Sequence, residues 1–227
     1  DEIHNFLGSD RGIQLQSLIH RIKIISSKKV AIIGLSATVS DVNQYSELKF
    51  YLGEPNNTKI IRDTTPKPIN ASFRYFESLT TNLSLDLLKD LYRETYNCKA
   101  LIFPNARGKV EEVAVKLKKI SEKVGGHPNF FAHHSAVDKE TREYVEFFAK
   151  SQIQQNFTIS CTSTLELGID IGNVEKVIQI DATHSIASLV QRIGRSGRRE
   201  GKSSNLVLYS TNSWSLLQSV ASWLLYQ

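Results

Sequence analysis

The sequence has few cysteines and no long apolar run. Its two cysteines, Cys98 and Cys161, are far apart in the 227 residues and fit no disulfide or metal-binding spacing. We interpret Cys161, at the end of an apolar run, as a buried thiol in a reducing compartment. No stretch approaches the ~18 uncharged apolar residues of a membrane helix, and no basic-then-apolar leader opens the sequence. We therefore expect a cytoplasmic protein without a membrane partner.

The composition is that of a globular protein with a basic balance. Hydrophobic residues make up 41% of the chain and charged residues 22%, which is enough apolar material to bury a core. The formal net charge of +5 favours a phosphate-bearing partner, although many basic proteins bind no nucleic acid. The first residue is Asp1 rather than methionine, so we expect further residues upstream.

Short apolar runs alternate with amphipathic stretches, which predicts an α/β fold around a parallel sheet. Helices are predicted over residues 110–124, 138–150 and 213–225, where apolar residues recur at helical spacing. The predicted strands are residues 30–35, 73–76, 100–103, 130–132, 157–161, 177–180 and 206–209.

A domain boundary is predicted around Pro66 and Pro68, because two prolines this close exclude helix and favour an extended linker. Residues 1–65 are too few for a complete doubly wound domain, whereas residues 73–227 suffice for one. We expect the first portion to be the C-terminal remnant of a domain, joined by a linker over residues 66–72 to a complete second domain.

Polar side chains follow two of the predicted strands, at the end where ligands bind in open α/β sheets. Ser36 and Thr38 follow the first predicted strand, although a hydroxyl there can also simply cap the next helix. Asn105 and Arg107 follow the third and are expected to face phosphates.

Two later strand ends carry further candidates. The hydroxyls of Thr162 and Ser163 are placed to hold phosphate, and Gly168 would let a ligand approach the backbone closely. The pair His133 and His134 would suit a metal, but no partner with ligand spacing lies nearby in the sequence. We expect these histidines to be hydrogen-bonded loop residues.

The segment 191–198, Gln-Arg-Ile-Gly-Arg-Ser-Gly-Arg, carries the strongest signal. On a helix, Gln191, Arg195 and Arg198 would lie within about 60° of one face, where three donor-rich side chains suit a triphosphate. Its two glycines would allow a second domain to approach. The alternative is a solvated basic helix, although a glycine inside such a helix costs ~1 kcal/mol.

In order along the chain, these segments resemble motifs II to VI of the superfamily 2 helicases. Asp1-Glu2-Ile3-His4 has the DExH form, and residues 7–12, the pair His133-His134 with Ser135, and residues 164–172 resemble the large helicase-related (Lhr-like) group. Two positions depart from the pattern: Gln191 stands where many relatives have His, and Ala106 stands where Thr is common.

The resemblance implies two RecA-like domains that bind ATP and Mg²⁺ between them and a nucleic-acid strand across both. It implies that Asp1 holds Mg²⁺ through water, that Glu2 orients and deprotonates the attacking water, and that Arg195 and Arg198 are arginine fingers. The other implied roles are cofactor binding (Gln191, Gly168, Asp170), coupling of nucleotide state to domain closure (His4, Ser36, Thr38) and nucleic-acid binding (Asn105, Arg107, Thr162, Ser163).

The phosphate-binding P-loop is not among these residues. Gly201-Lys202-Ser203 has Ser196 where the first P-loop glycine belongs and follows no buried strand, so the P-loop is expected in an upstream part of the same polypeptide. The leading hypothesis is an ATP-dependent helicase or translocase acting on DNA more than RNA. Two alternatives remain: a nucleic-acid-binding module without hydrolysis, and an unrelated α/β enzyme for a phosphorylated substrate.

Overall fold

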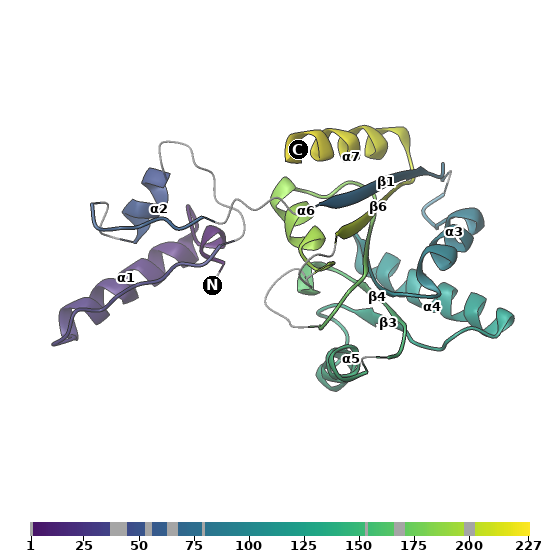
Figure 1. Cartoon of the computed structure of the whole chain (residues 1–227), viewed down its shortest axis with the longest axis horizontal. Coiled ribbons are helices and arrows are strands. Elements are labelled where there is room, and N and C mark those ends of the chain that lie inside the picture. Colours follow the sequence, from purple (N-terminus) through teal and green to yellow (C-terminus); the bar gives the residue numbers. More distant parts are fainter. Residues whose placement is uncertain are drawn as a thin grey trace. The chain divides into compact units, whose positions relative to one another are not determined.

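The computed structural model describes residues 2–36, 45–52, 56–62, 68–78, 80–152, 154–165, 171–197 and 203–227. The chain divides into two units, Asp1–Thr65 and Pro66–Gln227 (Figure 1). No helix in these described ranges is long and apolar enough to cross a membrane.

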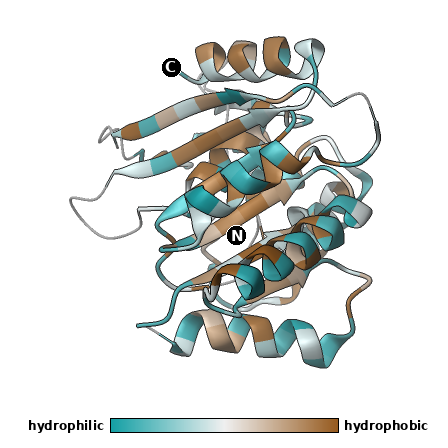
Figure 2. Ribbon diagram, turned by 90° about the vertical axis from the view of Figure 1, so that its right-hand side faces the viewer, coloured by the Kyte–Doolittle hydropathy of each residue, from teal (hydrophilic) through white to brown (hydrophobic). Residues whose placement is uncertain are grey.

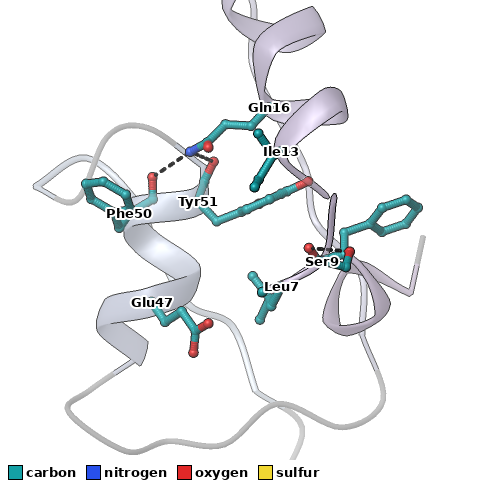
Figure 3. Close-up of a pocket in the computed structure, with 9 residues that line it drawn as sticks. Leu7, Ser9, Ile13, Gln16, Glu47, Phe50 and Tyr51 are labelled. Carbon is teal, nitrogen blue, oxygen red and sulfur yellow. Dashed lines mark hydrogen bonds between the residues drawn. The ribbon is translucent and has the colours of Figure 1, made fainter. Parts of the chain in front are cut away.

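The described residues of the first unit include one long helix, α1 (Asp10–Ile25), and the short helices η1 (Ile3–Asn5) and α2 (Ser46–Tyr51). The Ser9 side chain caps α1 by accepting a hydrogen bond from the Gly12 backbone N at 3.1 Å. The Tyr51 hydroxyl donates to Gly12 O at 2.9 Å, and Gln16 Nε2 donates to Tyr51 O at 3.2 Å. These bonds join α2 to α1 around a small pocket that contains none of the predicted site residues (Figure 3).

Residues 30–35, predicted to be a buried strand, do not form one. Ile33 is 81% exposed and Leu35 57% exposed. The backbone of this segment is held by a hydrogen bond from Ile3 N to Leu35 O at 3.0 Å. A strand needs a neighbouring strand to pair its backbone groups. Among the described residues of this unit no strand is available to pair with it.

The second unit contains a six-stranded sheet in which every pairing is parallel, as the sequence predicts. The strand order is β1-β6-β5-β2-β4-β3. The strands are β1 (Ile69–Tyr75), β2 (Lys99–Pro104), β3 (Phe130–His133), β4 (Phe157–Cys161), β5 (Lys176–Ile180) and β6 (Ser204–Ser210). All of them lie in the second unit, and no described residue of the first unit pairs with this sheet.

Helices cover both faces of this sheet and bury two apolar cores. The helices are α3 (Leu85–Thr95), α4 (Arg107–Val124), α5 (Lys139–Ser151), α6 (Ile186–Ile193) and α7 (Ser213–Tyr226). Along β2, Leu101 and Phe103 face a core with α5 and α6, whereas Ile102 faces one with α3 and α4, because successive strand residues point to opposite faces. Figure 2 shows strands that carry many hydrophobic (brown) residues between helices that carry both teal and brown residues.

The structure differs from the prediction in the start of one strand and in one additional helix. Strand β1 begins at Ile69, inside the stretch expected to be linker, because its backbone pairs with β6 from that residue onward. Helix α3 was not predicted, although Ser84 caps it by accepting from Leu87 N. Helix α5 coincides closely with the predicted range 138–150 and is capped by Asp138, whose Oδ1 accepts from Thr141 N at 2.8 Å. Cys161 is buried, as expected.

Candidate functional site

Three predicted residues of the first unit, Glu2, His4 and Ser36, lie together. His4 Nδ1 is 2.6 Å from Ser36 Oγ and 3.4 Å from Glu2 Oε2. Helix η1 orients His4, and the hydrogen bond from Ile3 N to Leu35 O holds the segment that carries Ser36. Glu2 has φ 52°, a left-handed conformation that costs about 1–2 kcal/mol in a residue other than glycine. Strain of this kind is concentrated at functional sites.

In the second unit, Arg107, Thr162 and Ser163 lie at one edge of the sheet. Strands β2 and β4 are parallel neighbours, so their carboxyl ends meet at the same edge. Arg107 begins α4 just after β2, and the 3-10 helix η3 (Ser163–Leu165) follows β4. Arg107 and Ser163 are exposed and Thr162 is half-buried. The arrangement offers a guanidinium and two hydroxyls to an anion approaching this edge.

Asn105 lies at the same edge, but its side chain is engaged within the protein. Its Nδ2 donates to Ala182 O at 2.7 Å, and its Oδ1 accepts from Gln179 Nε2 at 3.3 Å. Gln179 Oε1 in turn accepts from Arg192 Nη1, and the Arg192 guanidinium is 4.9 Å from the centre of the Phe103 ring. The sequence does not predict this network: the glutamine inside the apolar run 177–180 indicates a buried polar group but not which residues bond to it.

The prediction that Gln191, Arg195 and Arg198 share one helical face is wrong. Helix α6 carries Gln191 but ends at Ile193, so Arg195 follows the helix, where it is 7% exposed. Gly197 has φ +59°, and a Cβ there would lie 2.5 Å from Ser203 O. This glycine therefore serves a left-handed turn packed on its own backbone, not a thinned helix.

The two histidines are hydrogen-bonded, as expected. His133 Nε2 lies 2.9 Å from Glu146 Oε1, and His134 Nε2 lies 3.0 Å from Glu111 Oε1. The part of the chain that the structure describes contains no group of three or more His, Cys, Asp or Glu side chains placed to hold a metal ion. Five predicted site residues lie outside the described residues: Asp1, Thr38, Gly168, Asp170 and Arg198.

Comparison with known proteins decides the family. Residues 83–200 match the helicase conserved C-terminal domain. The chain belongs to this helicase family. The second unit accordingly has the RecA-like fold of a helicase C-terminal domain, and the predicted resemblance to superfamily 2 helicases of the Lhr group is confirmed.

Among similar proteins, ATP-dependent helicase Lhr-Core of Saccharolobus solfataricus is 34% identical over 206 residues, which cover 87% of this chain and 23% of that protein. Lhr-Core of Methanocaldococcus jannaschii is 34% identical over 230 residues, covering 97% of the chain and 25% of that protein. The structure of Mycobacterium smegmatis helicase Lhr bound to ssDNA and AMP-PNP aligns with a TM-score of 0.82 at 31% identity, over 98% of this chain and 29% of that one. The chain thus spans about a quarter of these curated relatives.

Proposed function

We propose that this chain is part of the motor of an ATP-dependent helicase or translocase of the Lhr group that acts on DNA more than on RNA. The observation that carries the proposal is the common sheet edge at which Arg107, Thr162 and Ser163 lie, in a domain of a helicase family. The similar Mycobacterium smegmatis protein has been solved with ssDNA and an ATP analogue, which supports the same two ligands for this chain.

The nucleic-acid strand would be held by its phosphates. The exposed Arg107 guanidinium supplies a charged donor, and the hydroxyls of Thr162 and Ser163 supply neutral ones, from the ends of two adjacent strands. Phosphate contacts fix the position of a strand without reading its sequence, as a motor that moves along a strand requires. The side chain of Asn105 would support this edge through its hydrogen bond to Ala182 O, not contact phosphate itself.

The first unit would supply the acidic half of the ATP site. Asp1 would offer Mg²⁺ the carboxylate that this ion prefers, held through water, and the strained backbone of Glu2 fits a residue held in place for its chemistry. When bound, Mg²⁺·ATP would supply the phosphoryl group to be transferred. Glu2 would then orient and deprotonate the attacking water, and His4 would link Glu2 to Ser36. We infer that the P-loop precedes Asp1.

Arg195 and Arg198 would act as arginine fingers that neutralise charge on the transferring phosphoryl group. Gln191, Gly168 and Asp170 would contact the nucleotide beside them. Arg195 follows the end of α6, where it is 7% exposed and its backbone N donates to Arg192 O at 3.0 Å. The segment between the helix end and the Gly197 turn therefore holds its backbone in a fixed position.

The phosphate contacts are tested by the salt dependence of single-stranded DNA binding to the intact protein. Arg107→Ala should reduce the slope of log K against log salt by about 0.7, the contribution of one phosphate contact on a single strand. Thr162→Ala should weaken binding without changing the slope, because its hydroxyl carries no charge. Arg93→Ala, at an exposed position of α3, is the matched control. An unchanged slope for Arg107→Ala would exclude the phosphate contact, and parallel titrations with RNA of the same sequence test the preference for DNA.

A further inference from the structure

We propose that His133 is a positioning residue for nucleic-acid binding. Its ring lies between Thr164 and Glu146 of α5, and through these two contacts it fixes the turn that presents Thr162 and Ser163 to the strand. The inference rests on the proposed function, because it assumes that this turn contacts the strand. His133 is the first residue of the pair His133-His134. We do not interpret this pair as a metal site, and the proposed function gives it no other role.

The histidine is buried and both of its ring nitrogens have a partner. Its side chain is 1% exposed, Nε2 lies 2.9 Å from Glu146 Oε1, and Nδ1 lies 3.0 Å from Thr164 Oγ1. An ionised carboxylate only accepts hydrogen bonds, so Nε2 carries the hydrogen towards Glu146. In the neutral ring, Nδ1 then accepts from the Thr164 hydroxyl.

This chain of bonds restrains the turn from one side of the sheet. The Thr162 backbone N also donates to His133 O at 3.3 Å, and Leu165, at the end of the turn, is buried. The turn is therefore anchored on both sides of Ser163, which is itself exposed. Of the three consecutive hydroxyl residues, Thr164 bonds to His133 within the protein. This bond fixes the turn and so the positions of Thr162 and Ser163.

The next residue does not share this arrangement. His134 Nε2 lies 3.0 Å from Glu111 Oε1 on α4, and Nδ1 accepts from Ala136 N at 3.3 Å. Adjacent residues at the end of a strand point to opposite faces of the sheet. The two histidines thus join the end of β3 to different helical layers, and of the two only His133 has a side-chain bond to the turn after β4 among the described contacts.

The test uses the intact protein and isosteric changes, because removing His133 itself would open a cavity. Thr164→Val deletes the hydroxyl and keeps the volume, and it should raise the Kd for single-stranded DNA about fivefold to tenfold, the effect of one hydrogen bond. Glu146→Ala, which frees the far side of the ring, should weaken binding in the same direction. The kcat for ATP at saturating DNA should stay within about twofold of wild type, because saturating DNA restores occupancy of the strand site.

Two controls match these changes. Thr158→Val makes the same substitution in β4, where the buried hydroxyl has no hydrogen-bond partner among the described residues, and Glu146→Gln keeps an acceptor for Nε2. Both should bind DNA as wild type does. In a double variant, Thr164→Val should add little to Thr162→Ala, because one acts through the other.

Wild-type DNA affinity in Thr164→Val would overturn the inference, and so would a fall in kcat at saturating DNA in parallel with the loss of affinity. If instead Thr162→Ala and Ser163→Ala leave binding unchanged, the phosphate contacts of the proposed function fail, and the inference fails with them. The two failures are therefore distinguishable.

Discussion

His4 Nδ1 lies 2.6 Å from Ser36 Oγ, although the two residues are 32 positions apart in the sequence. Glu2, two residues before His4, lies within 3.4 Å of the same ring nitrogen and has a left-handed backbone. The His4 ring therefore connects Glu2, the residue proposed to act on the attacking water, to Ser36. Such a contact can report the state of the nucleotide to the rest of the unit.

The first prediction concerns this contact. In the intact protein, Ser36→Ala should lower the amount of duplex unwound per ATP hydrolysed by about twofold to tenfold, the effect of losing one hydrogen bond. Binding of ATP and DNA should be unchanged, as measured by titration of each ligand. Ser26→Ala, which removes a hydroxyl bonded to Lys28 O in the same unit, should behave as wild type. Equal coupling ratios in the two variants would contradict the assigned role.

The second prediction concerns the turn after α6. Gly197→Ala should destabilise the chain by about 2 kcal/mol or more, because a left-handed φ disfavours a Cβ and the Cβ would meet Ser203 O at 2.5 Å. The melting temperature should fall by roughly 4–8 °C. Gly108→Ala is the matched control: no atom lies within 4 Å of its Cβ position in α4, and the change should stabilise the helix by about 0.5–1 kcal/mol. Similar melting temperatures for the two variants would rule out the tight turn.

The third prediction is a pH dependence of stability. Burial acts to raise the pKa of Glu94, but the hydrogen bond and charge of Lys176 and the nearby Arg74 outweigh it, so the pKa is lowered. A carboxylate with a lowered folded-state pKa stabilises the fold above its unfolded pKa and loses that contribution as pH falls through the folded value. Glu94→Gln should therefore lower the free energy of unfolding by about 1 kcal/mol at pH 7.

The difference between Glu94→Gln and wild type should shrink below roughly pH 4, where the unfolded-state carboxylate becomes protonated. Denaturant titrations at several pH values measure it. Glu122→Gln, at an exposed position of α4, serves as the control and should change the free energy of unfolding little at any pH. A constant deficit for Glu94→Gln from pH 3 to pH 8 would disprove the electrostatic origin.

Strands β2, β4, β5 and β6 were predictable because each contains a short apolar run that is buried in a parallel sheet. Strand β1 is mostly exposed, and its predicted run covered only part of it. Helix α3 could also have been predicted: Ser84 is a suitable cap, and Leu87, Leu88 and Leu91 recur at helical spacing. The run 30–35 has the same composition, yet it forms no strand in the structure, because pairing depends on neighbouring chain segments that a local pattern does not describe.

The positions of the site residues were also only partly predictable from the sequence. The sheet-edge position of Arg107, Thr162 and Ser163 follows from the parallel topology alone. The end of α6 does not: Gln191, Arg195 and Arg198 recur at helical spacing in the sequence, whereas the helix ends at Ile193 with Gly194 as its C-cap. Side-chain networks such as that of Arg192 and Gln179 join residues from different elements, so no spacing along the chain predicts them.

We propose that this chain supplies the arginine fingers and the acidic pair of an ATP-driven motor whose P-loop lies elsewhere in the polypeptide. Phosphate release with saturating single-stranded DNA tests this assignment, measured for the 227-residue chain, the intact protein, and the intact protein carrying Arg195→Ala, Arg195→Lys or the control Arg93→Ala. The intact protein and the control should hydrolyse ATP. Both Arg195 variants should still bind an ATP analogue but lose about 10³-fold or more in turnover, and the 227-residue chain should release no phosphate. DNA-stimulated hydrolysis by the 227-residue chain, or full activity of the Arg195 variants, would contradict the account.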